Sequence, residues 1–151
     1  MDLVGFFLAG AALLVAARLV LIERRLRRAR AESAFFRTIA EHARTGLVLQ
    51  APDTAILWCN AAYQTMTGYS AAELAGQYPV ELLVPPEDRP PDGLRRRFRI
   101  GPGAPGFGVP QLYTNLRKNG ERYYVELTES LIADRDGTSG DSIVTACRDV
   151  T

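Results

Sequence analysis

Residues that carry acid–base, nucleophilic or metal chemistry are scarce in this chain of 151 residues, which contains one histidine and two cysteines. No two residues have the spacing of a metal site, and His42 has no ligand partner near it in the sequence. Serine–histidine and cysteine–histidine arrangements are absent, and the glycine-rich segment 101–108 lacks the lysine that a phosphate-binding loop requires. The sequence therefore predicts no catalytic residue and no metal site, and we expect that the protein is not an enzyme.

Charged residues are also missing from residues 3–17, and the apolar run continues after Arg18 as far as Ile22. A helix of this length spans about 30 Å, enough to cross the hydrocarbon core of a bilayer. Positive charge follows the run, which favours a cytoplasmic position for everything after it. We expect a single-pass anchor of the inner membrane over residues 1–22, with a periplasmic N-terminus; the alternative is a buried core helix. The residues expected to meet membrane lipid are Arg18, Arg24, Arg25, Arg27, Arg28 and Arg30.

The remaining residues, 31–151, have little net charge, because twelve basic residues face fifteen acidic ones. A mildly acidic segment offers no electrostatic reason to bind nucleic acid. Cys59 and Cys147 lie in apolar runs of a segment that we place in a reducing compartment. We therefore expect both cysteines to be small buried hydrophobic residues and not a disulfide.

Turn and cap residues divide the chain after the anchor into short elements. Residues 23–44 are a basic juxtamembrane segment and a connecting helix, and a strand hairpin over 46–59 follows. Asn60 and Ser70 each have the position of a helix N-cap, and Gly68 and Gly76 the position of a helix end. A proline-broken segment over 78–100, which contains the basic residues 94–99, and an irregular loop 101–110 come next. Three strands complete the chain at 111–117, 122–133 and 143–150.

This order of elements predicts an α+β fold with an antiparallel sheet covered by helices on one face. The motifs NAAYQTMTGYSAAELAG, VPPEDR, LRKNGERYYVELTESLIADRDG and the closing RDVT also occur in this order. With these motifs the soluble part of the chain, from about Phe35 to Thr151, resembles the PAS family of sensor domains, and we place the PAS domain at 45–151. The resemblance implies a five-stranded antiparallel sheet with short helices on one face, here preceded by the single transmembrane helix. It also implies that Asp149 and Thr151 brace the exit of the last strand towards an output partner.

The resemblance makes two common PAS cofactors unsuited to this chain. Cys59 precedes Asn60 at the end of a strand, which does not reproduce the reactive-cysteine motif of the light-sensing flavin subgroup. The segment before the third strand has no histidine to ligate haem, and His42 lies before the first strand. We expect no cofactor, although the residues leave non-covalent flavin or a small metabolite open.

Five residues are candidates for lining a ligand pocket. Trp58, Tyr63, Met66 and Tyr69 could surround a ligand, although aromatic residues at such positions more often belong to the core. Glu129 interrupts an apolar strand face, where a carboxylate is costly to bury without a partner. Either a β-bulge or strand end turns Glu129 to solvent, or this residue is a polar anchor in the pocket wall.

Two functions fit these observations. No residue follows Thr151, which favours a non-enzymatic interaction subunit of a membrane complex, docked through its transmembrane helix and its PAS surface. The alternative is a signal-transduction sensor in which the PAS domain binds a small ligand or flavin and regulates a separate partner. In either case a homodimer is a further expectation, because the helix before a PAS domain often mediates dimerisation.

Overall fold

A computed structural model describes residues 3–89, 107–133 and 140–151, with side chains from residue 13 onward. The chain forms two compact units, Met1–Ile39 and Ala40–Thr151, each described here by itself. The predicted basic segment 94–99 and most of the predicted loop 101–110 lie outside the described residues.

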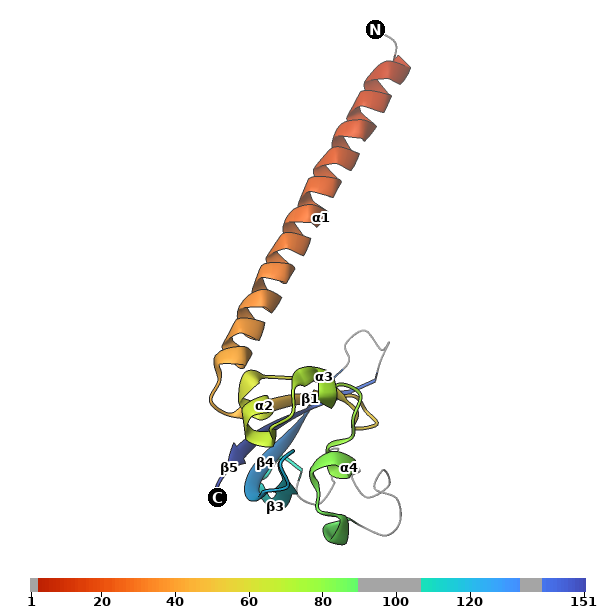
Figure 1. The fold of residues 1–151 in the computed structure, drawn as a ribbon. Coiled ribbons are helices and arrows are strands. Elements are labelled where there is room, and N and C mark those ends of the chain that lie inside the picture. Colours follow the sequence, from red (N-terminus) through yellow and green to blue (C-terminus); the bar gives the residue numbers. More distant parts are fainter. Residues whose placement is uncertain (1–2, 90–106, 134–139) are drawn as a thin grey trace. The chain divides into compact units, whose positions relative to one another are not determined.

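The first element is one unbroken helix, α1, which runs over 40 residues from Leu3 to His42 (Figure 1). The connecting helix expected within residues 23–44 is continuous with the helix that begins at Leu3. Residues 11–42 contain neither glycine nor proline and are rich in alanine, leucine and arginine, which are strong helix formers. Glu23 and Glu32 form ion pairs one turn away with Arg27 and Arg28, at 2.6 and 3.4 Å, which support the helix across the basic segment.

Within the described residues, no helix combines the length and the apolar character needed to cross a membrane. The predicted transmembrane anchor over 1–22 is therefore not supported by the structure. Residues 1–12 of that segment lie outside the part whose side chains are described. From residue 13 onward the apolar run is short, because Arg18 and then the arginines from Arg24 onward interrupt it.

The second unit is built on a five-stranded antiparallel sheet with the strand order β2-β1-β5-β4-β3 (Figure 1). The strands are β1 (Gly46–Gln50), β2 (Ile56–Cys59), β3 (Gln111–Leu116), β4 (Arg122–Ile132) and β5 (Ser142–Asp149). The sheet confirms the five antiparallel strands expected from the sequence. Because β5 inserts between β1 and β4, it brings the end of the chain to the centre of the sheet.

Short helices follow β2 and begin and end as their cap residues predict. Asn60 caps α2 (Ala61–Thr67) by accepting the backbone N–H of Tyr63, and Gly68 ends this helix with φ +79°. Ser70 caps α3 (Ala71–Leu74) as predicted, and Glu73 completes a capping box with it. These contacts span at most four residues, so the sequence alone is enough to place both helices.

Two further helical turns occupy the proline-broken segment that the sequence did not assign to helices. α4 spans Pro79–Leu83, and a single 3₁₀ turn, η1, spans Pro86–Asp88. Proline stands at the start of each, where its fixed φ favours the helix and its missing N–H is not needed. Neither turn has a side-chain cap, which explains why the cap pattern did not reveal them.

The core lies between the sheet and these helices. Its fully buried members include Val48, Ile56, Leu74, Tyr123 and Val125, each at most 2% exposed. The helices approach the sheet closely at Gly46, where an added Cβ would lie 3.0 Å from Met66 Cε and 3.2 Å from the carbonyl oxygen of Cys147. Glycine at this position therefore lets α2 pack directly onto β1.

Candidate functional site

A cavity of about 70 Å³ lies inside the second unit, between the sheet and the helices. Its sheet wall includes Val48 of β1, Val125 and Leu127 of β4, and Cys147 of β5. The opposite wall comes from the helices, with Tyr63 and Met66 on α2 and Pro79, Val80 and Leu83 on α4. Most of the wall is apolar, so the cavity suits a ligand with a hydrocarbon body.

A row of three polar side chains crosses the sheet wall of this cavity, from Gln50 on β1 through Thr145 on β5 to Glu129 on β4. The hydroxyl of Thr145 donates to Gln50 Oε1 at 2.9 Å, and Gln50 Nε2 donates to the carbonyl oxygen of Thr54 at 3.0 Å. Gln50 and Thr145 are at most 5% exposed, so these bonds satisfy groups that would otherwise be buried without partners.

Glu129 is the acidic member of this row. It lies directly opposite Thr145 in the β4–β5 ladder, whose register is continuous from Val125 to Ile132. Of the two alternatives for Glu129, the register excludes a β-bulge, and the residue lines the cavity wall. Burial raises the pKa of Glu129 above its ordinary value, because desolvation disfavours the charged form.

The other titratable groups in the wall stay neutral near pH 7. Burial raises the pKa of the Cys147 thiol to about 12, with a smaller contribution from the Glu129 carboxylate. The pKa of the Tyr63 phenol is well above 10, again mainly because of burial. Cys59 and Cys147 are both free and buried, as the sequence predicts, and a neutral thiol is a poor nucleophile.

The structure separates the five predicted pocket residues. Tyr63, Met66 and Glu129 line the cavity. Trp58 does not, because it pairs with Leu49 and so lies on the opposite face of the sheet from Val48. Tyr69 packs at the edge of the core, with Lys118 Nζ 5.7 Å from its ring centre.

Sequence reasoning missed the strand residues of the wall, above all Gln50 and Thr145. Both residues lie on predicted strands, and their neighbours along the strand are half-buried. Because side chains of a strand point alternately to its two faces, this alternation could have indicated that Gln50 and Thr145 face the core. Their contact joins residues 95 apart in the chain, which no local pattern indicates.

The residues proposed to brace the strand exit form a connected group. Arg117 Nη2 donates to Asp149 Oδ2 at 2.6 Å, and the hydroxyl of Thr151 accepts the backbone N–H of Tyr124 at 3.0 Å. Arg117 also donates to the carbonyl oxygen of Met66 on α2. Burial opposes ionisation of Asp149, but the bonds from Arg117 and Thr151 prevail and lower its pKa. One arginine thus joins a pocket-lining helix to the end of β5.

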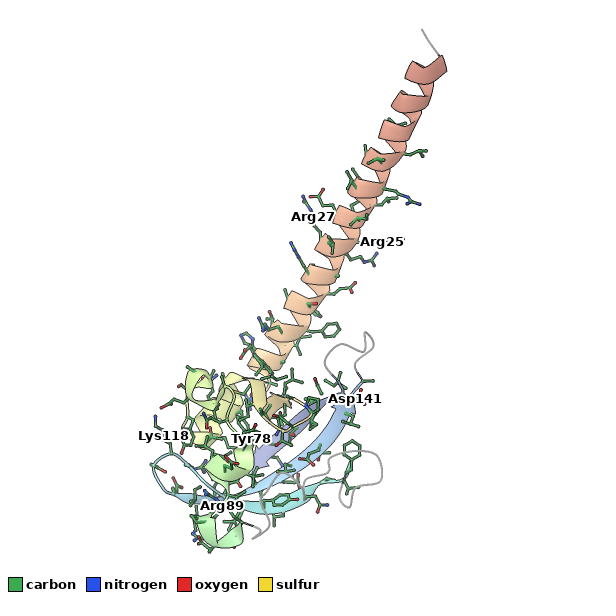
Figure 2. The ribbon with its side chains drawn as sticks, turned by 90° about the vertical axis from the view of Figure 1, so that its right-hand side faces the viewer. Arg25, Arg27, Tyr78, Arg89, Lys118 and Asp141 are labelled. Atoms are coloured by element: carbon green, nitrogen blue, oxygen red, sulfur yellow. The ribbon has the colours of Figure 1, made fainter. Side chains whose placement is uncertain are left out.

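The next residue, Lys118, forms a second link between the β3–β4 turn and the helices. Its ammonium lies 2.5 Å from a carboxylate oxygen of Glu73 on α3, and its backbone N–H donates to the carbonyl oxygen of Thr67 on α2 at 2.9 Å. Figure 2 shows Lys118 at this turn, beside the short helices.

The arginines predicted to contact lipid are exposed on α1, and Figure 2 shows Arg25 and Arg27 leaving it on opposite sides. Arg27 and Arg28 form ion pairs with glutamates of the same helix.

The described residues contain no metal-binding group. In the portion of the chain that is described, no three His, Cys, Asp or Glu residues lie close enough together to hold a metal ion.

A curated protein of known function is similar to this chain in sequence. The sensor histidine kinase TmoS of Ectopseudomonas mendocina is 31% identical over 105 residues, which make up 70% of this chain and 10% of the kinase. The chain therefore spans about a tenth of the length of this curated relative.

Solved structures share the fold. The PAS domain of an HTR-like protein from Haloarcula marismortui has a TM-score of 0.62 at 17% identity, covering 85% of this chain and 99% of that one. The PAS domain, in complex with ethanol, of a LuxR-family transcriptional regulator from Burkholderia thailandensis has a TM-score of 0.57 at 26% identity, covering 76% of this chain and 96% of that one. The sequence profile of the PAS domain matches residues 44–151. With its sheet, its helices and this match over most of its length, the chain belongs to the PAS domain family.

Proposed function

We propose that this chain is a sensor of signal transduction, whose PAS domain binds a small ligand and regulates a separate partner. The observation that carries the proposal is the apolar cavity between sheet and helices, crossed by the polar row of Gln50, Thr145 and Glu129. Two similarities support it. The chain resembles a segment of a sensor histidine kinase, and a PAS domain with 26% identity is described in complex with ethanol.

The contacts around Arg117 suggest how occupancy of the cavity would reach a partner. A ligand that moves Tyr63 or Met66 also acts on α2, whose Met66 carbonyl oxygen accepts a bond from Arg117. Arg117 in turn holds Asp149 at the end of β5. A ligand shifts the population of two states only if it binds one of them better. The proposal therefore requires two arrangements of α2, with different strengths of the Arg117–Asp149 pair.

The competing hypothesis, an accessory subunit of a membrane complex, draws no support from the relatives, whose descriptions name sensor and regulatory proteins. Inner-membrane location with a cytoplasmic PAS domain is a separate proposal. It rests on the apolar run 3–22 and on the five arginines between residues 24 and 30. Homodimer formation and the absence of enzymatic activity are likewise proposals.

A matched pair of variants tests the ligand pocket. Val80→Phe places a large ring in the cavity wall, whereas Val109→Phe makes the same change at an exposed site that is 51% accessible and outside the wall. The full-length chain is screened by thermal shift against compounds of up to about ten non-hydrogen atoms, within the range of efficient small ligands. We expect stabilising compounds that lose at least tenfold in affinity for Val80→Phe and keep their affinity for Val109→Phe. Stabilisation equal in both variants, or no binding compound at all, would contradict the sensor proposal.

A further inference from the structure

The electrostatic character of the cavity restricts the charge of its ligand. Among the described residues that line the cavity, Glu129 is the one acidic residue. These lining residues include no lysine, arginine or histidine. The Glu129 carboxylate is half-buried, and no described cation of the wall balances its charge. Ligands bearing a carboxylate or phosphate would add a second negative charge in the same low-dielectric space. The wall therefore selects against anions.

Among the described residues, Glu129 also has no bonding partner for its carboxylate, in an ion pair or in a hydrogen bond. Its opposite neighbour Thr145 gives its hydroxyl proton to Gln50, so that hydrogen is not available to Glu129. Arg117 and Lys118 lie at the β3–β4 turn, at the opposite end of β4 from Glu129, and pair with Asp149 and Glu73. Arg148 pairs with Glu126 on the other face of the sheet. A hydrogen-bond donor from outside the protein can satisfy the carboxylate.

The volume of the cavity restricts the size of the ligand. The cavity measures about 70 Å³ and therefore suits a small molecule. Typical cofactor pockets measure about 300–1,000 Å³. In this arrangement of the walls the cavity takes a short aliphatic chain with one polar head, and an isoalloxazine or porphyrin ring system is too large.

We propose that the cavity binds a small aliphatic amine as its ammonium ion. This inference rests on the proposed sensor function and names the ligand class of the same cavity. The ammonium group donates to the Glu129 carboxylate, and the hydrocarbon chain packs among Val125, Leu127 and Val80. An ammonium supplies both the positive charge and the hydrogen-bond donors that the carboxylate lacks, while an alcohol supplies a donor alone. Burial raises the pKa of the free Glu129, and a bound cation would lower it again.

Three probes of nearly equal size and different charge test the inference: n-butylamine, n-butanol and butyrate. Each is titrated into the full-length chain at pH 7.5, and binding is followed by the NMR shifts of the backbone amides of Val48 and Thr145. We expect n-butylamine to bind at least tenfold more tightly than n-butanol, and butyrate not to bind. The Glu129→Gln variant keeps the shape of the side chain and removes its charge, and it should lose this preference.

Glu126→Gln is the matched control, because Glu126 pairs with Arg148 at the surface on the other face of β4. It should retain the preference of the unmodified chain for n-butylamine. Equal binding of n-butylamine and n-butanol, or an unchanged preference in Glu129→Gln, would overturn the amine assignment and leave the sensor function standing. If none of the three probes perturbs the cavity amides, the amine assignment fails, and the wider screen with Val80→Phe and Val109→Phe decides whether the cavity binds another ligand.

Discussion

Single residues in the second unit combine several contacts, and Arg117 is an example at the residue scale. Its guanidinium bonds to Met66 and Asp149, lies 3.4 Å from Glu121, and stacks 4.3 Å from the ring centre of Tyr123. Only 18% of its side chain is exposed, so these contacts are less screened than ordinary surface pairs. A planar group with five donors can serve all of them at once, which a lysine could not.

Glu129 yields a prediction on stability and pH at the same scale. Because its pKa is raised in the folded state, the neutral form is favoured by folding, and the charged form costs stability once the pH exceeds the folded pKa. Without ligand, Glu129→Gln should therefore be more stable than the unmodified chain at pH 7, by less than about 1 kcal/mol because the carboxylate remains partly solvated. The difference should shrink as the pH falls through the folded pKa towards the ordinary value of 4.5.

Urea denaturation of the full-length chain at several pH values between 4 and 8 measures this difference. The groups that face Glu129 and titrate, Tyr113 and Cys147, do not ionise in this range, because burial raises the pKa of both above ordinary values of 10.0 and 9.0. Glu126→Gln again serves as the control. Lower stability of Glu129→Gln at pH 7 would mean that the carboxylate has a favourable partner in the unliganded protein.

At the scale of elements, Asn60 joins the end of α1, the strand β1 and the helix α2. Its side-chain oxygen accepts the backbone N–H groups of Leu47 and Tyr63, and its amide donates to the carbonyl oxygens of Ala40 and Thr45, all between 2.8 and 3.0 Å. The residue is fully buried. The sequence predicted the cap of α2, and the structure adds three contacts to other segments.

Asn60→Ala should consequently destabilise the protein more than the loss of a cap alone. A lost N-cap costs about 1 kcal/mol, and each buried group left without a partner about 1–3 kcal/mol. We expect a loss of about 3 kcal/mol, measured by urea denaturation of the full-length chain with fluorescence of its one tryptophan, Trp58. Asn119→Ala, at the exposed β3–β4 turn, should cost less than about 1 kcal/mol. Similar losses in both variants would contradict the joining role of Asn60.

On the scale of the whole molecule, the open question is where the chain resides. If the apolar run 3–22 inserts into the inner membrane, the full-length chain should sediment with membranes and resist extraction by alkaline carbonate. Protease should digest residues 45–151 in inside-out vesicles and spare them in right-side-out vesicles, as the arginines at 24–30 predict. Recovery of the chain in the soluble fraction, or digestion from the periplasmic side, would disprove the proposed topology.

Local chemistry explains which predictions from the sequence succeeded. Asn60, Gly68, Ser70 and Glu73 act on groups within four residues of themselves. The helical turns α4 and η1 were not predicted, because neither has a side-chain cap that the sequence pattern could reveal. The continuity of α1 was also missed, although its lack of glycine and proline after Gly10 could have indicated it.

The sequence by itself determined the PAS fold, the short helices with caps, and the scarcity of reactive groups, because each follows from residue types and short spacings. Only the tertiary structure decided the pocket. Trp58 lies on the opposite face of the sheet from the core residue Val48, and Glu129 lines the cavity with no bulge to turn it away. Which residues face one another across β1, β5 and β4 depends on strand order and register, and these are set by the packing of segments up to 95 residues apart.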